Sequence, residues 1–125
     1  MYGGVADPNV IDLVTYDPKT DEAVLVMYED RDWGLRGARL PQLEAKIDAY
    51  IAYWREDRIA KEYPPMKGKL VRFQLLCKDA PGEPEKTFIN RLRKERLAPL
   101  ELRLTVSILE EYVADHPNFR RPADR

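Results

Sequence analysis

The sequence contains little of the two side chains that carry most covalent and metal chemistry, with one cysteine and one histidine in 125 residues. A single cysteine excludes an internal disulfide and a zinc site built from cysteines. Cys77 alternates with apolar residues, so we expect it to be a small buried side chain. His116 precedes Pro117 in a polar C-terminal stretch, where we expect it to be solvated. Nucleophilic catalysis therefore has little support.

Three other features are missing from the sequence. No apolar run approaches the roughly 20 residues that cross a membrane. The net charge is −1, so no strong field attracts nucleic acid or an anionic membrane. No glycine-rich phosphate loop is present. The opening MYGGVADPN has neither the basic segment nor the apolar core of a secretory signal. We expect a cytoplasmic protein with no membrane association and no cofactor.

The clearest structural pattern is a pair of short apolar runs, Val10–Tyr16 and Ala23–Tyr28. Both are rich in β-branched and aromatic residues, which favour strands. Between them, Pro18 suits the second position of a turn and Asp17 can accept a local hydrogen bond. The pattern predicts a β-hairpin.

Both faces of this hairpin are apolar. We place Asp17 opposite Glu22 and Val14 opposite Leu25, and side chains then alternate between the faces. One face carries Ile11, Leu13, Val24, Val26 and Tyr28, and the other carries Val10, Asp12, Val14, Tyr16, Leu25 and Met27. Each face therefore needs a cover, from this chain or from another.

The rest of the chain predicts two helices and two strands. Apolar spacings of three and four indicate the helices, and alternation indicates the strands. In order, the elements are a helix from about Pro41 to Glu62, a strand Lys69–Lys78, a helix from Pro84 or Glu85 to Leu97, and a strand Leu100–Leu109.

The element order is thus ββαβαβ, and right-handed crossovers place both helices on one side. We predict an α+β or α/β two-layer sandwich, with a four-stranded mixed sheet, the hairpin at one edge and two helices on one face. We expect residues 1–125 to form a single domain, with residues 1–8 and 110–125 mobile.

The sheet face without helices is the first candidate functional surface. It would present an apolar interface of Val14, Tyr16, Leu25, Met27 and Leu76 beside the polar Arg72, Gln74, Arg103, Thr105 and Ser107. An apolar face of this kind indicates a non-enzymatic module for protein–protein contact. We expect a homodimer, with an unidentified protein as another partner to consider.

Carboxylates supply an alternative, a small metal-assisted or acid–base enzyme. Glu29, Asp30 and Asp32 crowd at a strand exit, and Mg²⁺ or Ca²⁺ prefers such oxygen ligands. Arg31 among them favours a structural role. Asp12 lies inside an apolar strand, where a carboxylate can acquire a shifted pKa or pair with an arginine. The candidate polar site therefore comprises Asp12, Glu29, Asp30, Asp32, Arg72 and Arg103.

The second helix is basic and offers a second alternative, weak nucleic-acid binding. Its cations are Lys86, Arg91, Arg93, Lys94 and Arg96. Such a cluster can contact phosphates. Nearby glutamates dilute it, so a solvated helix face is the simpler interpretation and we do not expect a nucleic-acid partner.

The hairpin and its exit, VIDLVTYDPKTDEAVLVM followed by EDRDW, resemble a family of small bacterial proteins classed as a domain of unknown function. The resemblance continues through Leu40–Tyr63 and the strand that ends at Lys78. It implies a bacterial soluble domain and no catalytic role, because the family has no established activity. The sequence therefore identifies neither a substrate nor a partner.

Overall fold

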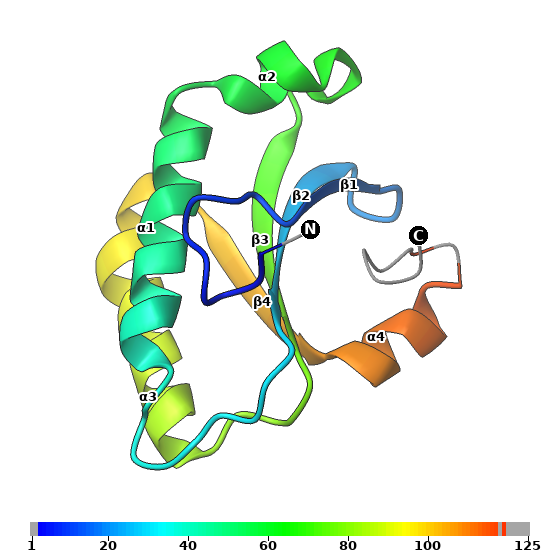
Figure 1. Ribbon diagram of the computed structural model, residues 1–125. Coiled ribbons are helices and arrows are strands. Elements are labelled where there is room, and N and C mark those ends of the chain that lie inside the picture. Colours follow the sequence, from blue (N-terminus) through cyan, green and yellow to red (C-terminus); the bar gives the residue numbers. More distant parts are fainter. Residues whose placement is uncertain (1–2, 118, 120–125) are drawn as a thin grey trace.

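The computed structural model describes residues 3–117 and 119 (Figure 1). In chain order the strands and helices are β1 (Leu13–Asp17), β2 (Glu22–Glu29), α1 (Leu40–Arg55), α2 (Arg58–Glu62), η1 (Pro64–Met66), β3 (Leu70–Cys77), α3 (Glu83–Leu92), η2 (Arg93–Leu97), η3 (Ala98–Leu100), β4 (Arg103–Ile108) and α4 (Leu109–Asp115). None of the helices in these described residues is long and apolar enough to cross a membrane.

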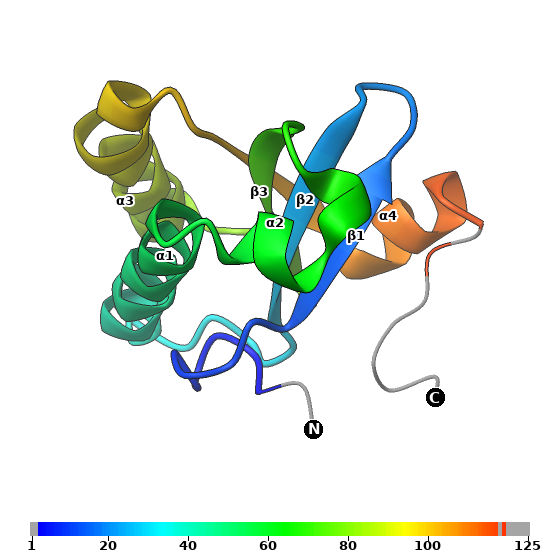
Figure 2. The same ribbon diagram turned by 90° about the horizontal axis from the view of Figure 1, so that it is seen from above.

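The four strands form one mixed sheet in the order β1-β2-β3-β4. β1 is antiparallel to β2, and β2, β3 and β4 are parallel. Helices α1 and α3 cover one face, and α4 lies on the other (Figures 1 and 2). The predicted mixed sheet, with the hairpin at one edge, is confirmed. The hairpin register, with Asp17 opposite Glu22 and Val14 opposite Leu25, is also confirmed.

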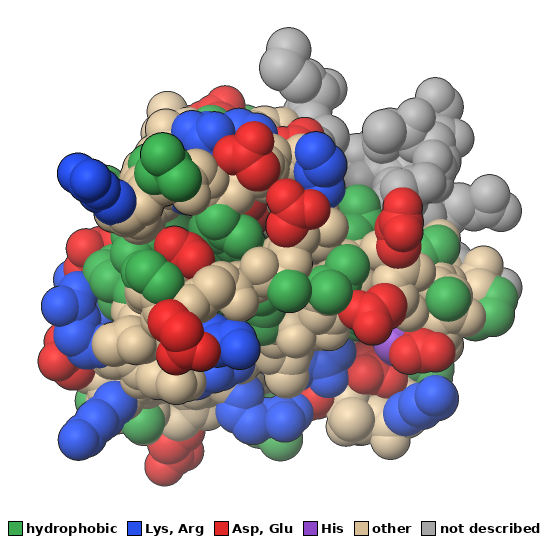
Figure 3. Space-filling model, turned by 90° about the horizontal axis from the view of Figure 1, so that it is seen from below, with side chains coloured by type: hydrophobic (Ala, Val, Ile, Leu, Met, Phe, Trp, Pro, Cys, Tyr) green, Lys and Arg blue, Asp and Glu red, His purple; other side chains and the backbone are tan. Residues whose placement is uncertain are grey.

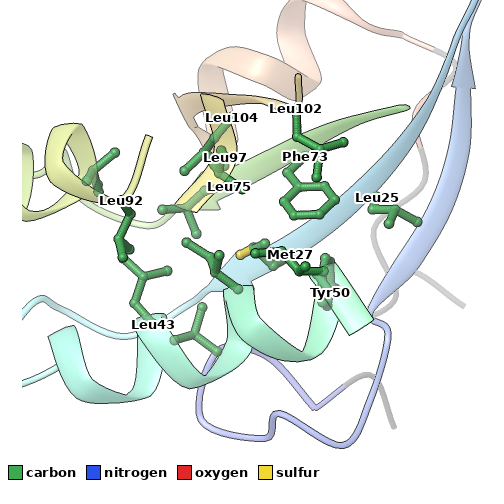
Figure 4. Packing of buried hydrophobic residues seen from close by; sticks show 14 of the residues in the cluster. Leu25, Met27, Leu43, Tyr50, Phe73, Leu75, Leu92, Leu97, Leu102 and Leu104 are labelled. Carbon is green, nitrogen blue, oxygen red and sulfur yellow. The ribbon is translucent and has the colours of Figure 1, made fainter. Parts of the chain in front are cut away.

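The main core lies between the sheet and α1 and α3, and it corrects one prediction. Val14, Leu25 and Met27 were expected on the uncovered face, but all three belong to this core. Leu25 pairs with Phe73 and Met27 pairs with Leu75, so these four side chains share the face under the helices (Figure 4).

The other two residues of the expected interface lie elsewhere. Tyr16 is at the end of the hairpin and 39% exposed. Leu76 does lie on the face opposite α1 and α3, in a smaller cluster with Val24, Val26, Tyr28 and Tyr112. We call this face the open face.

The first long helix is shorter than predicted. It ends at Arg55, and α2 begins three residues later. Asp57 between them has φ = 56°, the left-handed conformation that aspartate tolerates better than most residues. This left-handed residue separates α1 from α2, although the apolar spacing of the sequence continues from one helix into the other.

Both ends of the chain contact the body more than expected. Val5, in the lead-in predicted to be mobile, is 1% exposed and its N–H donates to the carbonyl of Tyr28 over 2.8 Å. Residues 110–115 of the predicted tail lie in α4, and Tyr112 is buried. Residues 1–2, 118 and 120–125 of these two segments lie outside the described residues.

A buried ion pair joins α1 to the start of the hairpin. The Lys46 ammonium lies 2.8 Å from Asp12 Oδ1, and neither side chain is exposed. The backbone N–H groups of Gly4 and Tyr28 also donate to this carboxylate, over 3.1 and 3.0 Å. Burial raises the pKa of Asp12, and the hydrogen bonds from Lys46 and the two N–H groups oppose that rise. The partner of Asp12 is therefore a lysine of α1, not an arginine as the sequence suggested.

Lys46 also fixes the lead-in. Its ammonium donates to the carbonyl oxygens of Asp7 and Val10, each over 2.6 Å. Its three contacts match the three donors of an ammonium group, so the buried charge is fully hydrogen-bonded. Lys46 is 0% exposed, so the whole side chain lies in the interior.

We predict that Asp12→Asn lowers the free energy of unfolding by about 3–5 kcal/mol, because it leaves a buried ammonium without its counter-charge. Lys46→Met should have a comparable effect, and the double variant should regain part of the loss. Urea unfolding measures all three. Lys86→Met removes an exposed lysine and serves as the control. An Asp12→Asn protein as stable as wild type would contradict the assignment.

Candidate functional site

The open face divides into an apolar half and a polar half. The apolar half follows β1 and β2 and carries Leu13, Val24, Val26 and Tyr28. The polar half follows β3 and β4 and carries Arg72, Gln74, Thr105 and Ser107. The two halves arise because alternation keeps every second residue of each strand on this face.

Helix α4 holds an aromatic stack against the open face. Tyr112 is 8% exposed and belongs to the apolar cluster on this face. The His116 ring stacks on the Tyr112 ring with centroids 3.9 Å apart and an interplanar angle of 12°. Phe119 packs edge-on against Tyr112 at 5.2 Å. The aromatic stack therefore covers part of the apolar half and forms a wall beside the polar half.

A hollow of about 600 Å³ lies between this wall and the polar half of the sheet. We call it the open-face pocket. It is lined by Arg72, Gln74, Ala80, Pro81, Thr105, Val106, Ser107, Ile108, Glu111, Tyr112, Asp115 and His116. Figure 3 shows the histidine bordered by acidic side chains on this side of the molecule. The volume lies within the range of small-molecule sites, about 300–1,000 Å³.

The floor of the pocket carries a directional chain of hydrogen bonds. The Thr105 hydroxyl donates to Gln74 Oε1, and Gln74 Nε2 donates to Ser107 Oγ over 3.3 Å. Because the Ser107 oxygen accepts in this chain, its own O–H is left to donate to another group. Ser107 is the only serine of the sequence.

The wall fixes the orientation of the His116 ring. Nδ1 lies 2.8 Å from the carbonyl oxygen of Tyr112. A carbonyl oxygen only accepts, so Nδ1 carries the hydrogen. In the neutral ring Nε2 is then an acceptor, which suits it to receive a hydrogen bond from a ligand.

A charge cluster borders the floor at the start of β2 and β3. Arg72 Nη1 contacts Glu22 at 2.9 Å and Asp17 at 3.1 Å, and Arg103 also pairs with Glu22. Burial raises the pKa of Glu22, but hydrogen bonds from Arg103 and Thr20 outweigh it and hold the pKa below its ordinary value. The pKa of Asp17 is likewise lowered, as its hydrogen bonds to Lys19 and Arg72 outweigh the effect of burial.

One donor of this cluster is unsatisfied. Arg72 is 6% exposed, and its Nε–H has no hydrogen-bond partner among the described residues. A buried donor without an acceptor costs about 1–3 kcal/mol. Arg72 also lines the open-face pocket, but this N–H itself is shielded from solvent.

The carboxylates proposed as a metal site do not converge. Glu29 accepts a bidentate pair of hydrogen bonds from Arg31, over 2.7 Å from Nη2 and 2.9 Å from Nε. Asp32 accepts from the N–H of Gly34, and Asp12 pairs with Lys46. Within residues 3–117 and 119, no three of His, Cys, Asp and Glu form a group that could hold a metal ion. Arg72 lines the open-face pocket, and Arg103 pairs with Glu22 beside it, at the opposite end of β2 from Glu29.

Two other candidate groups are placed by the structure away from reactive roles. Cys77 is 0% exposed, and burial raises the pKa of its thiol to about 12. In the basic helix, Arg96 pairs with Glu44 and Asp48 of α1. This cation therefore binds carboxylates of the chain itself.

Sequence reasoning missed the wall of the pocket. His116 was interpreted as a solvated tail residue, and Tyr112 lay in the segment that was expected to be mobile. The pattern that could have revealed α4 is the spacing of three between Leu109 and Tyr112 among acidic residues, which is typical of a short amphipathic helix.

The comparisons with known proteins identify a family and no function. The model of a family of unknown function (DUF6572) matches residues 3–110. No curated protein and no solved structure gives a significant match.

We predict that the charge cluster makes stability depend on acid. Because the folded state holds the pKa of Glu22 below its ordinary 4.5, the unfolded state binds the proton more tightly. The stabilisation is present above the ordinary pKa and is lost as the pH falls through the folded value. Urea unfolding between about pH 5 and pH 3 should therefore be less pH-dependent for Glu22→Gln than for wild type. Glu110→Gln should match wild type, and equal slopes for all three proteins would contradict the prediction.

Proposed function

The chain belongs to this family, whose function is unknown, and we propose from the geometry of the open-face pocket that the protein binds a small polar molecule there. The family match includes the whole polar floor and ends at residue 110. The wall residues Tyr112, Asp115 and His116 follow the matched part.

The polar floor is the observation that carries this proposal. Arg72 is 6% and Gln74 2% exposed, although the same positions of a sheet face usually hold apolar side chains when they are covered. Burying such groups is costly unless they are hydrogen-bonded. Here they are oriented by the charge cluster and by the chain through Ser107, and they line a hollow. Oriented polar groups in a hollow of this size are typical of a ligand site.

Binding is favoured over catalysis by the geometry of the only serine and the only histidine. Both line the open-face pocket, but no hydrogen bond joins Ser107 to His116 in the part of the chain that the structure describes. A nucleophile is normally activated by such a bond to its base. We therefore assign Ser107 the role of a ligand donor.

We predict that some members of a panel of small neutral, anionic, cationic and zwitterionic compounds will shift the amide resonances of Ser107, Tyr112 and His116 in ¹H–¹⁵N spectra. Ser107→Ala removes the free hydroxyl and should weaken binding of those compounds that carry a hydrogen-bond acceptor. Thr87→Ala, on the exposed side of α3, is the matched control.

The opposite result would be spectra in which no compound of any class perturbs the residues around the pocket. The proposal would also fail if Thr87→Ala reduced binding as much as Ser107→Ala, because the effect would then not come from the pocket.

As a second function we propose self-association through β1. Among residues 3–117 and 119, this strand pairs only with β2 and forms one edge of the sheet. Its sequence, LVTYD, contains neither the lysine nor the proline that commonly protects an edge. Two copies can then continue the sheet by antiparallel pairing of their β1 strands. This edge replaces the face of Leu25 and Met27 as the basis for the expected homodimer.

We predict that light scattering will give a mass of about 29 kDa, twice the 14.6 kDa of one chain. Thr15→Lys should return the mass to that of one chain, because a charge on an edge strand opposes pairing. Thr87→Lys is the control. A wild-type protein that remains at 14.6 kDa throughout a dilution series would refute the dimer.

A further inference from the structure

We infer that the open-face pocket selects molecules that combine a protonated amine with a carboxylate or amide, as in a small amino acid. This inference rests on the proposed binding function and specifies its ligand class. It follows from the different chemistry of the floor and the wall.

The floor offers hydrogen-bond donors. The Ser107 oxygen already accepts from Gln74, so its O–H is left to donate. The Arg72 side chain, which also lines the pocket, adds a guanidinium group on the same side. A free hydroxyl and a guanidinium on one side of a hollow favour an acceptor group on the ligand, such as a carboxylate or a carbonyl oxygen.

The wall offers acceptors. Glu111 and Asp115 are exposed carboxylates of α4 that line the pocket. His116 adds Nε2 as an acceptor when the ring is neutral, because Nδ1 faces the Tyr112 carbonyl. An ammonium group has three donors and no acceptor, and therefore complements this wall.

The charges around the pocket oppose a simple anion. The guanidinium groups of Arg72 and Arg103 are balanced by the carboxylates of Asp17 and Glu22, so this cluster sums to zero. The remaining carboxylates, Glu111 and Asp115, make the pocket negative. An acid alone would meet this repulsion, whereas a zwitterion places its amine against the wall.

The experiment uses three matched series at neutral pH, with amide shifts of Ser107 and His116 as the readout. The amino acids are glycine, β-alanine and γ-aminobutyrate, the acids are acetate, propionate and butyrate, and the amines are methylamine, ethylamine and propylamine. We expect at least one amino acid to bind about two- to fivefold more tightly than its matched acid, which is the range expected for an exposed ion pair.

Two variants assign each end of the ligand. Glu111→Gln combined with Asp115→Asn should lower the affinity for the amino acid to that for the matched acid. Glu110→Gln, on the same helix but outside the pocket, should not. Ser107→Ala should weaken binding of the amino acid and leave binding of the amine unchanged. Both altered carboxylates are exposed, so the fold should tolerate their neutralisation.

The possible failures are distinguishable. The ligand class is overturned if an acid binds as tightly as its matched amino acid. It is also overturned if Glu110→Gln lowers the affinity for the amino acid as much as the double variant does. If neutral compounds or acids shift the pocket residues while no amino acid does, the ligand class is wrong and the binding function stands. If no compound of any class shifts them, the binding function fails and this inference fails with it.

Discussion

Strand β2 is buried along its entire length of eight residues, and the rest of the molecule is arranged to cover it. Its two sets of side chains are both apolar, so one face alone cannot form the core. Helices α1 and α3 cover Leu25 and Met27, and α4 brings Tyr112 over Val24 and Val26. Burial of apolar area on both faces is the main stabilising contribution that such a strand makes.

The same constraint explains why a pocket exists. A helix of seven residues is about 10 Å long, whereas four strands spaced about 4.8 Å apart span roughly 14 Å. Helix α4 therefore cannot span the whole open face, and a hollow remains between it and the polar half of the sheet. The floor of this hollow carries Arg72 and Gln74, which are buried and hydrogen-bonded, and the half-buried Ser107. The pocket therefore exists because α4 is shorter than the width of the sheet on which it lies.

Much of the fold could be predicted from the sequence because it depends on local patterns. Period-two alternation and the turn at Pro18 determine the strands and the hairpin register, and the helix stripes determine the layer that covers one face. The side of the hairpin that faces the helices could not be predicted, because both sides are apolar and the choice depends on pairing with Phe73 and Leu75. Lys46 was also unpredictable, since its partner Asp12 is 34 residues away and its role appears only when both are buried.

The site was predictable only in part, for a related reason. Arg72, Gln74, Thr105 and Ser107 share a face by alternation alone, and they were expected together. Their wall comes from a short acidic segment whose helical pattern covers fewer than two heptads and is easily mistaken for a tail. Carboxylates that crowd in the sequence, such as Glu29 and Asp32, instead bind their own neighbours. Proximity along the chain was therefore a poor guide to convergence in space.

The open-face pocket depends most directly on the contact between α4 and the sheet. Nuclear Overhauser effects between the Tyr112 ring and the methyl groups of the open-face cluster test this contact in solution. We expect cross-peaks from the ring to methyl groups of Val24, Val26 or Leu76, and protection of these methyl groups from a soluble paramagnetic probe. The absence of such cross-peaks, together with methyl groups that the probe reaches, would contradict the proposed cover and the pocket that it forms.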